Sequence, residues 1–220
     1  MRPLLVLRPE PGASATVDRA RRRGLDAVAA PLFEIEPMAW RAPEAGSFDG
    51  LLLTSANALR HGGEQLQPLR GLPVYAVGEA TAEVARQRGF DITATGDDGI
   101  DRLLGLIDGQ LKLLHLCSED RREPAETQQN ITSIVVYRAK SIESPDLHDV
   151  AGSVALIHSP RAGRRFAELV EDRSSVAIAA ISAAAAAAAG RGWHAVEAAQ
   201  SPDDDTLLAL AERLCNNLRR

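Results

Sequence analysis

Small and hydroxyl-bearing residues follow short apolar runs at many points of this 220-residue sequence. If the runs are strands of a parallel sheet, these residues stand at the carboxyl ends of the strands, where open α/β sheets bind ligands. Most also precede a candidate helix, whose first N–H groups are free to bind anions. The pattern therefore predicts a ligand with several anionic groups. The positions are Arg8, Thr54, Ser55, Gly78, Thr81, Cys117, Ser118, Ser159, Pro160 and Ser182.

A simpler interpretation holds for each serine taken singly, because serine is among the preferred N-cap residues of helices. Motifs for dinucleotides, P-loop phosphates, zinc proteases and serine hydrolases are absent from the sequence. The five histidines have no metal-ligand spacing. We therefore expect no cofactor and no metal, with backbone groups carrying much of the recognition.

Strand and helix candidates alternate along the chain, which predicts an α/β fold with parallel sheets. The strand candidates lack polar alternation, as strands buried on both faces do. Ser201 with Pro202 is the best helix start, with the serine as N-cap. Ala183–Ala189 is a strong helix former whose small side chains suit close packing. The strand candidates are Leu4–Leu7, Ala27–Ala30, Leu51–Thr54, Val74–Val77, Leu113–Leu116, Ser133–Tyr137, Ala155–His158, Ala177–Ile181 and Ala195–Ala199.

An internal repeat relates the two halves of the chain. Gly50–Arg60 and Val154–Arg164 each combine an apolar run, a polar residue, a serine and a helix-like stretch, and the two serines are 104 positions apart. A second pair, Val74–Gly78 and Ala177–Ser182, has nearly the same offset. This repetition predicts two similar structural units in one chain.

Two segments alternate between apolar and polar residues, unlike the buried runs. They are Pro31–Pro37 and Ile134–Lys140, and both lie at boundaries between the repeats. Alternation is typical of a ribbon exposed on both sides. We expect them to link the units and to pair with each other. By contrast, Glu119–Asn130 is short for a full crossover helix, and we expect it to be irregular.

Charge and composition narrow the class of protein. The net charge of −5 and the pI near 5.6 disfavour a nucleic-acid binder. No apolar run reaches the length of a membrane span, and the first apolar run is too short for a signal peptide. Cys117 and Cys215 form neither a disulfide framework nor a zinc motif. We expect a cytoplasmic protein with no nucleic-acid or membrane partner.

An ordered set of motifs over nearly the whole chain resembles the uroporphyrinogen-III synthase family. Each motif alone is weak, and the specificity lies in their order. The matching segments are Leu5–Pro9, Gly50–Ala58, Ala76–Ala82, Val135–Arg138, His158–Ala162, Ala180–Ser182, Gly192–Trp193 and Ser201–Leu208.

The resemblance implies two flavodoxin-like parallel-sheet domains joined by a two-stranded antiparallel β-ladder, with the active site in the cleft between them. The first domain is expected to be discontinuous. The expected boundaries are residues 1–34 plus 141–220 for the first domain, 39–134 for the second, and 35–38 and 135–140 for the ladder.

The activity implied by the resemblance is cyclisation of hydroxymethylbilane, a linear tetrapyrrole with acetate and propionate groups on every ring. Water is lost and the terminal ring is inverted through a spiro intermediate, giving uroporphyrinogen III. The family's tyrosine at the end of the ladder strand is Tyr137 here, which would assist departure of the hydroxyl. The residues expected to bind the substrate are Arg8, Thr54, Ser55, Asn57, Gly78, Thr81, Ser118, Ser159 and, through backbone donors, Ser182.

A monomer is expected, with a possible transient contact to the enzyme that makes the substrate. Two other classes of protein stay open on the sequence alone. One is a catalytically inactive two-domain member that serves as a binding or regulatory module. The other is a flavodoxin-like receptor for a sugar or phosphate. Tyr137 and Asn57 are present, which favours the enzyme.

Overall fold

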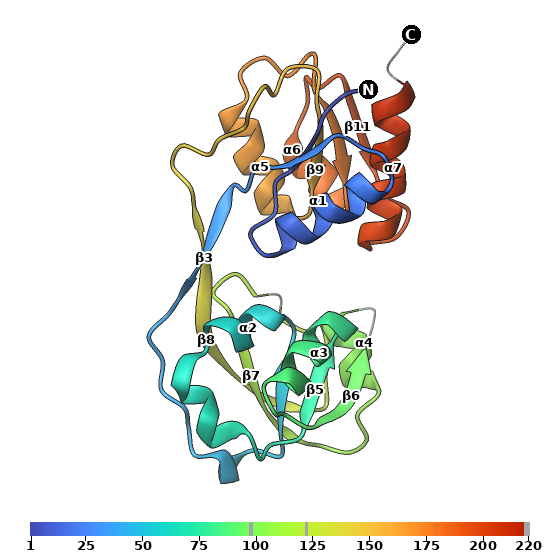
Figure 1. Cartoon of the computed structure of the whole chain (residues 1–220). Helices are drawn as coiled ribbons and strands as arrows, with labels where there is room; N and C mark the ends of the chain where they lie inside the picture. The colour runs from blue at the N-terminus through green and yellow to red at the C-terminus, as the bar shows by residue number, and fades with distance from the viewer. Residues whose placement is uncertain (97–98, 122, 218–220) are drawn as a thin grey trace. The chain divides into compact units, whose positions relative to one another are not determined.

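The computed structural model describes residues 1–96, 99–121 and 123–217, and it separates into two compact units (Figure 1). Unit 1 contains Met1–Glu34 and Ser141–Arg220, and unit 2 contains Ile35–Lys140. The chain therefore passes twice between the units, once through each of the two segments with alternating apolar and polar residues. Among the described residues, no helix has the length and apolar character needed to cross a membrane.

Unit 1 is a five-stranded parallel sheet in the order β11-β10-β9-β1-β2. Read from β2, and with the strands of this unit numbered 1 to 5 along the chain, the order is 2-1-3-4-5. This is the flavodoxin order, and its switch point lies between β1 and β9. The elements are β1 (Leu4–Val6), α1 (Gly12–Arg22), β2 (Ala27–Ala29), β9 (Val154–Ile157), α5 (Pro160–Leu169), β10 (Ala177–Ala180), α6 (Ala183–Ala189), β11 (Ala195–Ala198) and α7 (Asp204–Asn217).

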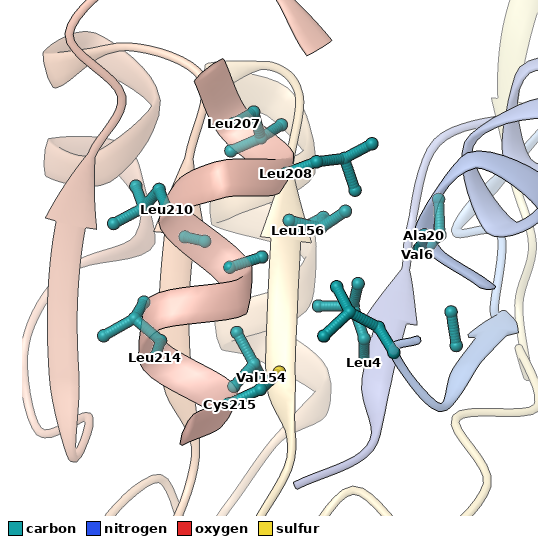
Figure 2. Close-up of a cluster of buried hydrophobic side chains, with 14 of the residues drawn as sticks. Leu4, Val6, Ala20, Val154, Leu156, Leu207, Leu208, Leu210, Leu214 and Cys215 are labelled. Atoms are coloured by element: carbon teal, nitrogen blue, oxygen red, sulfur yellow. The ribbon is translucent and has the colours of Figure 1, made fainter. Parts of the chain in front are cut away.

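Helices α1 and α7 cover one face of this sheet. Figure 2 shows Leu208 of α7 beside Leu156 of β9, and Leu207 and Leu214 of α7 belong to the same cluster, as does Leu4 of β1. All five of these side chains are at most 4% exposed. Helices α5 and α6 pack on the other face. The three central strands, β10, β9 and β1, are buried on both sides, which explains why they read as uninterrupted apolar runs.

Unit 2 contains a mixed six-stranded sheet in the order β3-β8-β7-β4-β5-β6. Its topological switch point lies between β4 and β7. The elements are β3 (Phe33–Pro37, which begins in unit 1), η1 (Ala45–Ser47), β4 (Gly50–Leu53), α2 (Ala56–His61), η2 (Gly63–Leu69), β5 (Val74–Val77), α3 (Glu79–Gln87), β6 (Ile92–Gly96), α4 (Ile100–Gly105), β7 (Lys112–Ser118) and β8 (Asn130–Ser141, which ends in unit 1).

The two faces of this sheet carry different helices. Side chains of α2, η2 and α3 pack with Leu51 and Leu53 of β4. Side chains of α4 pack with Leu52 of β4 and Leu113 of β7. Because successive residues of a strand point to opposite faces, these two clusters fix the face to which every neighbouring strand residue belongs.

The predicted ladder between the two alternating segments is present, since β3 is the neighbour of β8. The Met38 N–H donates to the Val136 carbonyl at 2.9 Å, and the Ile142 N–H donates to the Leu32 carbonyl at 3.0 Å. The residue numbers rise along one strand while those of its partners fall, so the pairing is antiparallel. On the ladder, Glu36 accepts hydrogen bonds from Arg138 and Lys140.

Two local expectations differ from the structure. β6 has no counterpart among the predicted strands, because Thr93 and Thr95 interrupt its apolar residues. Ser201 is not the N-cap of the last helix: α7 begins at Asp204, and Asp203 accepts the Thr206 N–H at 2.8 Å. A carboxylate at this position satisfies a free helix N–H and the helix dipole together, which the serine two residues earlier does not.

The internal repeat corresponds to a shared topology. With β4 matched to β9 and β5 to β10, the order β6-β5-β4-β7-β8 of unit 2 is the order β11-β10-β9-β1-β2 of unit 1. The chain enters this common arrangement at different strands: unit 2 begins with β4, whereas unit 1 begins with β1, which is equivalent to β7. The connection from β1 to β2 contains α1, whereas the described residues between β7 and β8 form turns and bends without a helix.

Candidate active site

Three hydroxyl groups meet at the carboxyl edge of the unit 2 sheet, beside its switch point. Ser55 follows β4, Ser118 ends β7, and Tyr137 lies on β8. The side chains of Ser55 and Ser118 both act on the Tyr137 hydroxyl, and both lower its pKa. The Tyr137 side chain is 7% exposed. Parallel strands bring their carboxyl ends to one edge, so three residues distant in sequence become neighbours.

A β-bulge places the tyrosine next to Ser118. Cys117 pairs with Val135, but Ser118 pairs with Tyr137, so β8 has one extra residue, Val136, at this point. Val136 and Tyr137 consequently both pack into the cluster under α2 and α3, although they are consecutive. Bulges commonly redirect a side chain in this way. Here the bulge aligns Tyr137 with Ser118 across the two strands.

Burial raises the pKa of Tyr137, and the side chains of Ser55 and Ser118 oppose that rise. The phenol therefore keeps its proton at neutral pH and is a hydrogen-bond donor. The His61 ring lies 6.3 Å from the tyrosine ring, centroid to centroid, at an interplanar angle of 34°. Burial, with Arg60 and Arg88 nearby, lowers the pKa of His61, which favours its neutral form.

The other residues of unit 2 that were predicted to bind the substrate each have different contacts. Ser55 caps α2 by accepting the Asn57 N–H at 3.2 Å. The Asn57 side chain accepts a hydrogen bond from Arg60 at 3.1 Å. Gly78 precedes α3 with φ of +80°, a conformation that favours glycine. Thr81 is only 6% exposed within α3, so its side chain faces the protein.

Thr54 belongs to a separate polar group on the opposite face of the same sheet. Its Oγ1 lies 3.0 Å from Nε2 of His115, and Nδ1 of that ring lies 3.4 Å from Ser133 Oγ. His115 is 1% exposed, and burial lowers its pKa to about 4, with Arg121 adding to the effect. No role for His115 was predicted from the sequence. A lone histidine inside the run Leu113–Leu116 was the available signal of a buried polar group.

In unit 1, Ser159 and Ser182 occupy the equivalent edge and cap helices. Ser159 accepts the Ala162 N–H at 3.1 Å, and Ser182 accepts the Ala185 N–H at 3.3 Å. The N-cap interpretation therefore describes both side chains. The first backbone N–H groups of α6 have no acceptor within the helix and can bind an anion, whereas Pro160 at the start of α5 has no N–H to offer.

Arg8, also at this edge, donates to Asp204 at 2.9 Å. Arg19 and Thr16 of α1 donate to the same carboxylate oxygen, and His158 lies 3.5 Å from the other oxygen. Burial by itself raises the pKa of Asp204, but His158 and the arginines hold it well below its usual range. The carboxylate is thus ionised, and it ties α7 to β1 and α1.

The described residues contain no group of three or more His, Cys, Asp or Glu side chains arranged to hold a metal ion. The groups identified at both edges are hydroxyl and backbone N–H groups, with arginine nearby. Such donors suit a ligand rich in carboxylates.

Fold and site together define the class of protein: a two-unit parallel α/β protein with hydroxyl groups and helix N-termini at its strand ends. The family model of uroporphyrinogen-III synthase HemD matches residues 14–209. The chain belongs to this family.

Comparisons with individual proteins agree. A uroporphyrinogen-III synthase of Chlorobaculum parvum is 33% identical over 101 residues, covering 42% of this chain. The match spans 41% of that relative, so less than half of its length is covered. The uroporphyrinogen-III synthetase structure from Helicobacter pylori gives a TM-score of 0.69 at 18% identity, covering 97% of this chain and all of that one. A mutant synthase of Thermus thermophilus gives 0.54 at 16% identity, covering 97% of this chain and 99% of that one. The predicted fold class is confirmed by these structures.

Proposed function

We propose that this protein is a uroporphyrinogen-III synthase, which converts hydroxymethylbilane into uroporphyrinogen III and water. The observation that carries the proposal is the family match over residues 14–209. The chemistry of the strand ends supports it, because the substrate carries an acetate and a propionate on every ring and the edges offer hydroxyl and backbone N–H donors.

The proposed reaction begins when the terminal C–O bond of the substrate breaks. The hydroxyl leaves as water with a proton from the site, and an azafulvene cation remains. The far pyrrole ring attacks through its substituted carbon, giving a spiro intermediate that fragments and recloses with that ring inverted. Loss of one proton after closure gives the neutral macrocycle and returns the proton that the departing water took. The protein must favour attack at the substituted carbon over the spontaneous closure, and each tenfold preference corresponds to about 1.4 kcal/mol.

Tyr137 is proposed as the group that assists departure of the hydroxyl. The raised pKa of Tyr137 keeps its phenol protonated at neutral pH, so the hydroxyl can donate a proton or a hydrogen bond. Ser55 and Ser118 are proposed to orient the phenol, since both side chains act on it. Positioned donors of this kind act by orientation and by stabilising charge as it develops. Arg8, Asn57, Gly78, Thr81, Ser159 and Ser182 are proposed, with Ser55, Ser118 and Thr54, to bind substrate carboxylates.

The test is incubation of the purified protein with hydroxymethylbilane, oxidation of the products and separation of the isomers. The type III isomer should form in excess. Type I alone, at the rate without protein, would overturn the proposal and leave a binding module as the interpretation.

Tyr137→Phe tests the proposed donor. The variant retains the ring and its packing but loses the hydroxyl, so we expect kcat to fall by about tenfold or more while the fold is retained. Tyr75→Phe is the matched control, since Tyr75 on β5 is the second tyrosine of the chain and lies on a different strand. Equal rates in Tyr137→Phe and wild type would remove Tyr137 from the mechanism.

A further inference from the structure

His115 occupies a place in the unit 2 sheet where an apolar residue would be expected. It lies in the centre of β7, directly opposite Leu52 of β4 and Ser133 of β8. Its side chain shares the α4 face with Leu113 and Leu52, which are fully buried. A polar ring in such a position is costly unless its nitrogens are satisfied. The two contacts it makes therefore require an explanation.

Both contacts are to hydroxyl groups, which can donate or accept, so the ring tautomer decides the direction of each hydrogen bond. Nε2 lies 3.0 Å from Thr54 Oγ1, the usual length of an N–H···O bond, whereas Nδ1 lies 3.4 Å from Ser133 Oγ. A buried N–H that lacks a well-placed acceptor costs more free energy than a buried acceptor nitrogen that receives only a long hydrogen bond. The ring proton is therefore best placed on Nε2.

The position of that proton determines what Thr54 offers to a ligand. If Nε2–H donates to Thr54 Oγ1, the hydroxyl hydrogen of Thr54 is free to point elsewhere. If Nε2 instead accepts, that hydrogen is used up inside the protein and Thr54 presents only a lone pair. Thr54 is half-buried at the carboxyl end of β4, one residue before the cap of α2. Only the first arrangement makes it a donor to an anion.

We propose that His115 is a positioning residue which donates its Nε2–H to Thr54 and so turns the Thr54 hydroxyl into a hydrogen-bond donor for a carboxylate of the substrate. This inference rests on the proposed function, because it assumes that a carboxylate-rich substrate binds at this strand end. His115 itself does not contact the substrate, and it acts through Thr54.

The ring remains neutral under assay conditions, since burial keeps its pKa near 4. Arg121 and Glu123 are the charged groups that act on the ring, and their effects on its pKa are opposite in sign. The tautomer can therefore be measured directly at neutral pH, without substrate. In ¹⁵N-histidine-labelled protein, His115 should give the ring-nitrogen shifts of the Nε2–H tautomer, assigned by their loss in His115→Gln. Shifts of the Nδ1–H form would overturn the proposal.

Kinetics of a double-mutant cycle test the link to Thr54. Thr54→Val removes one hydrogen bond to a charged group, so KM for hydroxymethylbilane should rise by about tenfold with little change in kcat. His115→Leu leaves the Thr54 hydroxyl hydrogen free but no longer oriented, so KM should rise by a smaller factor, and the double variant should be no worse than Thr54→Val alone. His115→Gln retains a neutral N–H donor and should restore most of the loss. His194→Leu, a change of an exposed histidine, is the control.

A merely structural role of His115 would reduce the fraction of folded protein and the apparent kcat while KM stays the same. An unchanged KM in His115→Leu, or KM effects of the two variants that multiply, overturns the inference and leaves the proposed function intact. Wild-type protein that forms no type III isomer overturns both. If His115→Leu fails to fold, His115→Gln and the wild-type tautomer still decide the outcome.

Discussion

Acidification should destabilise unit 2 through His115. The perturbation is a decrease in pH from about 7 to about 4.5, without any change of sequence. In the unfolded chain this imidazole has its ordinary pKa of 6.5, whereas in the folded protein burial lowers the pKa to about 4. Between these two values the unfolded state binds one more proton than the folded state. Stability is therefore fully present above pH 6.5 and falls as the pH decreases towards 4.

The size of the effect follows from the difference between the two pKa values. Each pH unit in this window costs about 1.4 kcal/mol of unfolding free energy, so the loss is about 2–3 kcal/mol at pH 4.5. This is a large part of the stability of a typical domain, which is about 5–15 kcal/mol. His61 and His158 also have pKa values lowered by burial and contribute in the same direction. A comparison with a variant is therefore needed to isolate His115.

The assay is urea denaturation followed by tryptophan fluorescence at several pH values. The chain has two tryptophans, Trp40 in unit 2 and Trp193 in unit 1, so a Trp193→Phe background makes the signal specific for unit 2. Trp40 packs against the unit 2 core and donates its ring N–H to the Gly62 carbonyl at 3.0 Å. In this background, His115→Gln should have a flatter dependence of stability on pH than the protein with histidine. Parallel curves for the two proteins would show that His115 does not cause the loss of stability at low pH.

Two further predictions concern unit 1. Asp204→Asn removes the charge that accepts hydrogen bonds from Arg8 and Arg19, so urea denaturation followed through Trp193 should show a loss of about 2 kcal/mol that diminishes in high salt; equal stability would show that the ion pairs contribute nothing. Gly163→Val should cost about 1–3 kcal/mol in the same measurement, because even a Cβ on Gly163 would lie 2.9 Å from the backbone oxygen of Ala185, and an unchanged midpoint would contradict this close helix contact.

Burial patterns made most of the fold predictable from the sequence. Apolar runs such as Val154–Ile157 must be buried in the folded protein, because exposing them to water is too costly. The seven-alanine helix was predicted at its observed bounds, Ala183–Ala189. Its close packing on α5 depends on Gly163 opposite it, which a propensity argument does not reveal. β6 was missed because Thr93 and Thr95 alternate with its apolar residues, so no uninterrupted apolar run marks this strand.

The candidate site was predictable only in part, because its geometry depends on register. The carboxyl-end rule selects Ser55 and Ser118 as neighbours, and the resemblance supplies Tyr137. The extra residue in β8 that aligns the tyrosine with Ser118 has no signature in the sequence. The pairing of Arg8 with Asp204 likewise joins residues 196 positions apart. Such contacts result from the folded topology, so residue types alone cannot rank one partner above another.

The common strand order of the two units explains why unit 2 tolerates a buried histidine. In unit 1, α1 connects β1 to β2 and places apolar side chains such as Val17 on the face that α7 also covers. The equivalent connection in unit 2, between β7 and β8, has no helix among its described residues. On the corresponding face, beside α4, lie His115 and Ser133. The ring nitrogens are partnered within the sheet by Thr54 and Ser133, and Arg121 and Glu123 of the β7–β8 connection act on the ring. The polar group therefore faces a connection that brings charged side chains near it, where unit 1 has an apolar helix.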